Sequence, residues 1–69
     1  MIYKVQWQYK KEKDRQKFHP HNEWVNIPNG FEEMEERGID LAKWLASRDG
    51  LIKNWRCVGD NGKVVWRMQ

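Results

Sequence analysis

Apolar and polar residues alternate without a fault at the start of the chain. Within residues 3–10 the apolar positions are Tyr3, Val5, Trp7 and Tyr9, and the polar positions between them are Lys4, Gln6, Gln8 and Lys10. A period of two, with β-branched and aromatic residues on one side, is typical of a strand with one buried face. The pattern therefore predicts a strand over about residues 2–10.

The next two stretches lose this alternation. Residues 11–23 are dominated by charge and predict a basic loop, in which Phe18 could attach part of the loop to the body of the protein. Residues 24–27 predict a short extended segment, with Trp24 and Ile27 facing the core. Pro28 keeps the residue before it out of helical geometry, so the segment should end there.

A helix is predicted over about residues 30–49. Asn29 is a suitable N-cap, and Glu32 follows at the capping-box spacing. Apolar or small residues recur every three or four positions, at Phe31, Met34, Gly38, Leu41 and Leu45. Gly38 could end a first short helix, with Asp40 capping a second one. It could instead lie inside one continuous helix and let the sheet approach closely, which its place on the apolar stripe favours. Gly50 is a natural residue to follow the helix.

The end of the chain predicts a hairpin, with strands 52–58 and 63–68 around the turn sequence GDNG. A loop at Asn61 and Gly62 pairs Cys57 with Trp66, and a loop one residue earlier pairs Cys57 with Val64. In both registers one face carries Trp55, Cys57, Val64, Trp66 and Met68, and the other carries Arg56, Val58, Val65 and Arg67.

These elements predict one α+β domain over residues 1–69. We expect two layers, in which one helix covers a three- to four-stranded, mostly antiparallel sheet in strand-helix-strand-strand order. With 69 residues and a lone cysteine, the chain has no internal disulfide and must rely on its aromatic residues for a core. Cys57 fits a small core residue better than a nucleophile. No apolar run reaches a membrane-spanning length, so we expect a soluble, cytoplasmic protein.

The net charge of +3 is unevenly distributed. Residues 1–22 carry a balance of +4, residues 23–50 of −4 and residues 51–69 of +3. On the predicted fold, the sheet face away from the helix is basic and rich in amides, with Lys4, Gln6, Gln8, Lys10, Asn54, Arg56, Arg67 and Gln69. It is either a solvated face or a surface for nucleic-acid phosphates or an acidic partner. The loop lysines and arginine (Lys11, Lys13, Arg15 and Lys17) would extend that surface. We expect no aromatic ladder on it, which disfavours the stacking that single-strand binders use.

The outer side of the predicted helix is acidic. Glu33, Glu36 and Asp40 are spaced about one turn apart, and they are either an ordinary solvated face or a patch that binds a basic groove on another protein. Trp44 lies off the apolar stripe, so it either packs on the sheet edge or stands exposed as an interface anchor.

His19 and His21 are the one candidate pair for chemistry. They could help to bind a metal or act as acid and base in RNA cleavage, but neither reading is specific at this spacing. We therefore expect no metal, no cofactor and no catalytic residue.

The resulting hypothesis is a non-enzymatic binding module that inhibits or modulates a larger protein or nucleoprotein. Its size and tryptophan content suit a product of a phage or mobile element. The alternatives are a direct DNA- or RNA-binding protein that uses the basic sheet face, and a small metal-independent ribonuclease that uses His19 and His21. We expect no membrane partner, and either a monomer or a homodimer.

Overall fold

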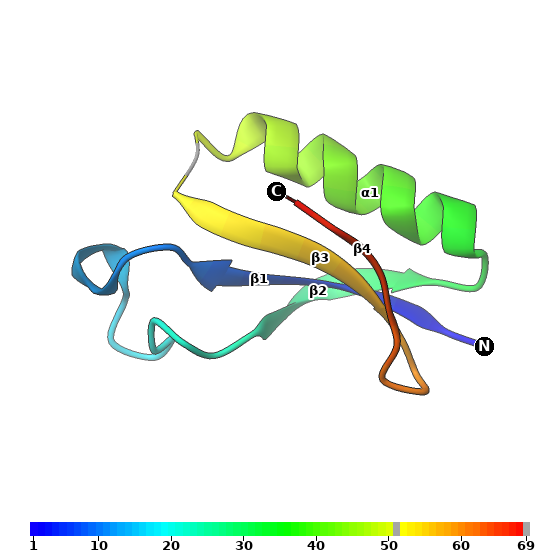
Figure 1. Ribbon diagram of the computed structural model, residues 1–69, viewed down its shortest axis with the longest axis horizontal. Coiled ribbons are helices and arrows are strands. Elements are labelled where there is room, and N and C mark those ends of the chain that lie inside the picture. The colour runs from blue at the N-terminus through cyan, green and yellow to red at the C-terminus, as the bar shows by residue number, and fades with distance from the viewer. Residues whose placement is uncertain (51, 69) are drawn as a thin grey trace.

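A four-stranded antiparallel sheet with one helix on one face makes up the protein, as a computed structural model that describes residues 1–50 and 52–68 shows (Figure 1). The sheet order is β2-β1-β3-β4. The elements are β1 (Tyr3–Tyr9), a short 3-10 helix η1 (Glu12–Asp14), β2 (Val25–Glu32), α1 (Glu35–Arg48), β3 (Lys53–Gly59) and β4 (Val64–Arg67). The predicted α+β class and element order are confirmed.

The second strand is longer than predicted, and the helix begins later. β2 reaches Glu32, and α1 starts at Glu35 instead of near residue 30. The expected N-cap, Asn29, has a φ of 60° inside an irregularity of β2, where residues 27–30 lie opposite the single residue Val5. Asn suits helix caps and left-handed backbone equally, so its type could not distinguish the two. The residue that does precede α1, Met34, makes no side-chain cap hydrogen bond to any residue that the structure describes.

The helix is continuous through Gly38, as its position on the apolar stripe favoured. A Cβ on Gly38 would stand 2.8 Å from Sγ of Cys57 and 3.1 Å from Cβ of Tyr3. Glycine at this position therefore lets α1 lie directly on β1 and β3. The two other early positions of the predicted stripe were wrong, because Phe31 belongs to β2 and Met34 precedes the helix, and both are exposed.

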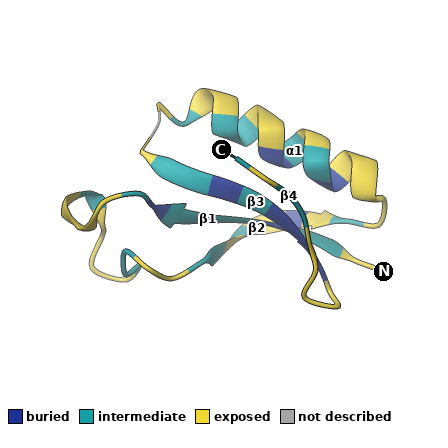
Figure 2. Ribbon diagram, viewed as in Figure 1, coloured by how far each residue is buried: buried dark blue, intermediate teal, exposed yellow. Residues whose placement is uncertain are grey.

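The core lies between α1 and the two central strands. Val5, Ala42, Trp55 and Cys57 are buried, and around them pack Tyr3, Trp7, Ile27, Ile39, Leu41, Leu45, Ala46, Val65, Trp66 and Met68. Figure 2 shows the buried residues on β1, β3 and the sheet-facing side of α1, with exposed residues along the outer side of the helix. The predicted covered face is thus correct for β1 and β3.

The hairpin between β3 and β4 follows the first of the two predicted registers only in part. Cys57 pairs with Trp66, as a loop at Asn61 and Gly62 requires, but Val58 pairs with Val64 across a bulge. The bulge moves Val64 to the face of Val58 and leaves Val65 against the core, so the predicted faces of these two valines were wrong. Arg56 and Arg67 still pair as that register predicts.

The basic loop of residues 11–23 lies at the opposite end of the molecule from the β3–β4 turn (Figure 1). It contains η1 and a single bridge between Gln16 and His19. Phe18 is 81% exposed, so it does not attach the loop to the body of the protein as proposed. Among residues 1–50 and 52–68, no helix combines the length and the apolar character needed to cross a membrane.

Candidate binding surface on the open sheet face

Side chains that share a face of the sheet follow from the strand registers. On the face away from α1, which we call the open face, one row runs through Asn26, Gln6, Arg56 and Arg67 across all four strands. The neighbouring row runs through Phe31, Lys4, Val58 and Val64, and on the other side Gln8 pairs with Asn54. None of these residues is acidic.

The central row is held by a chain of side-chain contacts. Arg56 Nε donates to Oε1 of Gln6 at 2.8 Å, and Nε2 of Gln6 donates to Oδ1 of Asn26 at 2.7 Å. The Arg56 guanidinium also lies over the ring of Trp24, 4.0 Å from its centroid. An arginine stacked on an aromatic ring and fixed by a hydrogen bond has little rotamer freedom left, so this cluster is ordered in advance of any ligand.

The charge of this row is not neutralised within the described residues. Arg56 and Arg67 lie directly opposite each other on β3 and β4, and like charges in that position destabilise a sheet. Within residues 1–50 and 52–68, the one ion pair joins Lys53 to Asp49, so neither arginine has a carboxylate partner there. Burial also lowers the pKa of Arg56, which means that its charge is partly desolvated without an anion beside it.

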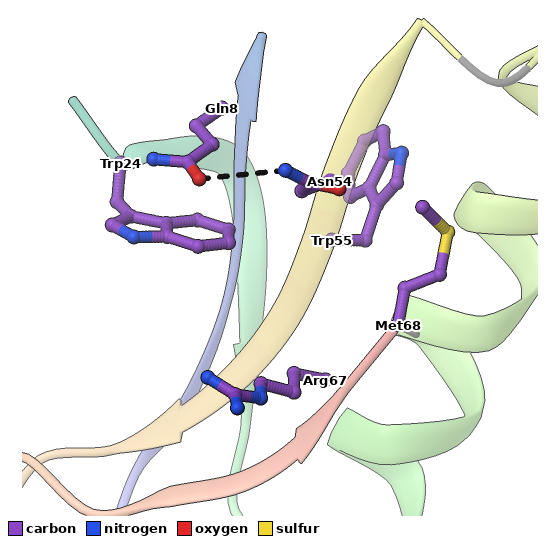
Figure 3. Close-up of a pocket in the computed structure, with 6 residues that line it drawn as sticks. All are labelled: Gln8, Trp24, Asn54, Trp55, Arg67 and Met68. Carbon is purple, nitrogen blue, oxygen red and sulfur yellow. Dashed lines mark hydrogen bonds between the residues drawn. The ribbon is translucent and has the colours of Figure 1, made fainter. Parts of the chain in front are cut away.

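An open pocket of about 320 Å³ lies at the Gln8 end of this face. It is lined by Gln8, Trp24, Asn54, Trp55, Arg67 and Met68. Figure 3 shows Trp24, Gln8 and the Arg67 guanidinium on one side of β3, with Trp55 and Met68 on the other side toward the helix. Nδ2 of Asn54 donates to Oε1 of Gln8 at a distance of 3.5 Å, which is at the long limit for a hydrogen bond. The pocket thus combines a flat aromatic wall, two amides and a guanidinium.

Most of the residues predicted for the basic, amide-rich face lie on the open face. Lys4, Gln6, Gln8, Arg56 and Arg67 share the open face through their strand pairs, whereas Lys10 stands one residue beyond β1. Gln69, which was also expected there, lies outside the described residues.

The sequence reasoning missed the aromatic residues of this face. Trp24 was expected in the core, but it stacks with Arg56, and Phe31 was assigned to the helix but pairs with Lys4. A strict period of two would have given the signal, because Trp24 and Ile27 are an odd number of positions apart and cannot both face the core. The open face therefore carries two rings that the sequence did not place there, Trp24 before β2 and Phe31 near its end.

The predicted acidic residues are exposed on the opposite layer. Glu36 and Asp40 lie one turn apart on α1, and Glu33 precedes the helix. Trp44 is 54% exposed and carries the guanidinium of Arg48 at 4.6 Å from its ring centroid. Of the two positions considered for Trp44, the structure therefore has the exposed one.

His19 and Cys57 pack against apolar or aromatic neighbours. The His19 ring meets Trp7 edge-on with centroids 5.2 Å apart, and Nδ1 of His21 is buried with no hydrogen-bond partner among the described residues. No group of three or more metal-binding side chains occurs among residues 1–50 and 52–68. Cys57 is fully buried, and burial, followed by the charge of Glu35, raises the pKa of its thiol. A raised pKa disfavours the thiolate, which is the reactive form.

Comparison with known proteins adds no relative to this picture. No family model, curated protein or solved structure matches the chain.

Proposed function

We propose that the protein is a non-enzymatic module that binds nucleic acid on its open sheet face. The observation that carries the proposal is the pair Arg56 and Arg67, which oppose each other with no carboxylate partner among the described residues. Arg56 also lies over the ring of Trp24. A phosphate between two such arginines relieves their repulsion and replaces the water that Arg56 has lost.

The other side chains of the face suit the same ligand. Gln6, Gln8, Asn26 and Asn54 offer amides, which can bond phosphate oxygens or base edges. Trp24 and Phe31 offer aromatic surface. Phosphate groups do not use such a surface, whereas nucleic-acid bases stack on it. Charge, amides and rings together favour a nucleic acid over a simple anion or an acidic protein.

Salt-dependent binding is the first test. We expect fluorescence anisotropy to show that the protein binds short DNA or RNA at low salt, with an affinity that falls steeply as salt is added. The double variant Arg56→Glu/Arg67→Glu should abolish this binding. The milder Arg56→Gln/Arg67→Gln should flatten the slope of log K against log salt by about 1.4–1.8, the effect of two phosphate contacts.

A charge-matched control separates a local site from the overall field. Arg37→Glu/Lys43→Glu makes the same change in net charge on exposed positions of α1. We expect it to weaken binding far less than the change on the open face, with thermal melts confirming that both proteins are folded. Equal losses in the two variants, or a parent protein that binds neither DNA nor RNA at low salt, would show the proposal to be wrong.

A second candidate function uses the outer side of α1. Trp44 is more than half exposed and follows Glu36 and Asp40 at successive four-residue steps along α1. An exposed ring in line with carboxylates suits a protein partner whose groove is basic and has an apolar base. The module would then inhibit or modulate a larger protein, as the sequence suggested.

Two changes test that second function. Purification of partners from a lysate, with nuclease present to remove bridging nucleic acid, should recover a protein with the parent and not with Trp44→Ala or Glu33→Lys/Glu36→Lys. Arg56→Gln/Arg67→Gln is the control, since it changes only the open face. Recovery that is indifferent to the helix variants would contradict the use of α1.

A further inference from the structure

We infer that the pocket at the Gln8 end of the open face takes one unpaired nucleobase, stacked on Trp24, so that the ligand of the protein is a single strand. The inference rests on the proposed function. It adds that the nucleic acid is single-stranded and that the protein contacts a base as well as phosphates. DNA and RNA both supply this chemistry, and the test below includes both.

The pocket has the size and the walls for such a group. Its volume of about 320 Å³ is at the lower end of the range for small-molecule sites, which suits one planar ring system rather than an extended ligand. Trp24 forms a flat wall of the pocket. Arg56, which lies over one face of that ring and is not among the lining residues, holds the ring in place before a base arrives. A base that stacks there gains a contact that depends on its π-face and not on its sequence.

Polar groups in the pocket match the edge of a base and its phosphate. Gln8 and Asn54 are held to each other by one long hydrogen bond, so their remaining donors and acceptors stay available for a base edge. Arg67 lines the same pocket from β4, where it can hold the adjoining phosphate. The three side chains come from three neighbouring strands, so the sheet itself sets their spacing.

A duplex does not offer what this pocket binds. Its bases are stacked on each other inside the helix, and their faces are not exposed to a protein ring. Within the described residues, the open face also presents no helix that could enter a groove, since α1 covers the opposite face (Figure 1). Phosphates alone would let a duplex bind, but without the stacking contact.

The experiment compares ligands that differ only in their bases. Labelled single-stranded DNA, single-stranded RNA, the matching duplexes and an abasic strand of the same length are titrated by anisotropy at fixed low salt. We expect at least one single strand to bind about tenfold or more tightly than its duplex and than the abasic strand. This arm uses the parent protein, so it does not depend on the folding of a variant.

Tryptophan variants locate the contact. Trp24→Ala should weaken single-strand binding by roughly 5- to 100-fold and leave duplex binding little changed. Trp24→Phe should retain most of the affinity, and Trp44→Ala, which removes an exposed ring from the other layer, should have no effect. If single strand, duplex and abasic strand bind equally, or if Trp24→Ala is folded and binds single strands as the parent does, the base pocket is wrong while the basic surface stands. If no nucleic acid binds, both proposals fail.

Discussion

Gly38 of α1 lies against Cys57 of β3, so close that a side chain on the glycine would meet the sulfur. A Cβ built there stands 2.8 Å from Sγ, closer than ordinary packing allows. The contact joins the helix layer to the central strand of the sheet, and Cys57 is fully buried beneath it. The separation of the two layers is therefore set by a residue that has no side chain.

Gly38→Ala should destabilise the protein even though alanine is the better helix former. Helix propensity gains about 1 kcal/mol, whereas overpacking of a tight core costs roughly 1–3 kcal/mol. The difference leaves a net loss of up to about 2 kcal/mol, and melting temperature should fall by roughly 4–8 °C for each kcal/mol lost. The same change in a Cys57→Ala background should cost less, because the sulfur is gone. Denaturant unfolding of the four proteins measures this coupling, and additive effects would contradict the contact.

The buried thiol of Cys57 should make the protein less stable in alkali. Burial raises the pKa of Cys57, with a further contribution from the charge of Glu35. In the unfolded chain the thiol ionises from about pH 8.5 upward, while in the folded protein it stays protonated. The unfolded state then binds fewer protons, so the stabilisation is complete below that pH and is lost as the pH rises.

Comparison of the parent with Cys57→Ala isolates this effect. All other side chains are common to both proteins, so their effects cancel in the comparison. We expect the parent to lose more free energy of unfolding than the variant between about pH 8 and pH 10. Equal losses would mean that the thiol titrates normally in the fold.

The sequence predicted the fold through its strongest periodic signals. The alternation from Tyr3 to Tyr9 gave a complete strand, and the Gly59–Gly62 turn gave the hairpin. It failed where one residue type serves two geometries. Asn29 is a good cap and a good left-handed residue, and Phe31 and Met34 fall at helical spacing from Gly38 by coincidence. A bulge such as the one at Val65 leaves no mark in a hydrophobic pattern.

The candidate surface was predicted in its charges and not in its rings. The alternation of side chains along each strand is enough to place Gln6, Arg56 and Arg67 on one face of the sheet, because residues that pair across neighbouring strands share a face. Trp24 was assigned to the core because large rings usually lie there. Its contact with Arg56 reaches from the residue before β2 across β1 to β3, and such a tertiary contact has no local signature.

Lys53 should contribute to stability through the aromatic residues around it. Its Nζ lies 4.5 Å from the ring centroid of Trp7 and 5.9 Å from those of Tyr9 and Trp55, and 3.8 Å from a carboxylate oxygen of Asp49. The side chain is 28% exposed, so part of this attraction is not screened by water.

Substitution should separate the charge of Lys53 from its aliphatic stem. Lys53→Met keeps the stem and loses the cation, and we expect a loss of about 0.5–1 kcal/mol. Lys53→Ala should cost more, since the stem covers apolar surface. The same two changes at the exposed Lys63 should be close to neutral. Denaturant unfolding of the four variants gives these values. If Lys53→Met is as stable as the parent, the side chain of Lys53 stabilises the protein through packing and not through its charge.

Gly62 in the β3–β4 turn should resist substitution because of its backbone conformation alone. Its φ is 86°, and a Cβ there would meet no atom within 4 Å, so any cost is purely one of backbone conformation. The turn is otherwise closed by hydrogen bonds from Gly62 N–H to Gly59 O at 2.9 Å and from Lys63 N–H to Asn61 Oδ1 at 3.0 Å. Gly62→Ala should cost about 1–2 kcal/mol, the penalty of left-handed backbone for an ordinary residue. Gly62→Asn should cost clearly less, because asparagine visits that region readily. Thermal unfolding of the two variants measures the difference. Equal losses of stability would contradict a cost that comes from left-handed backbone.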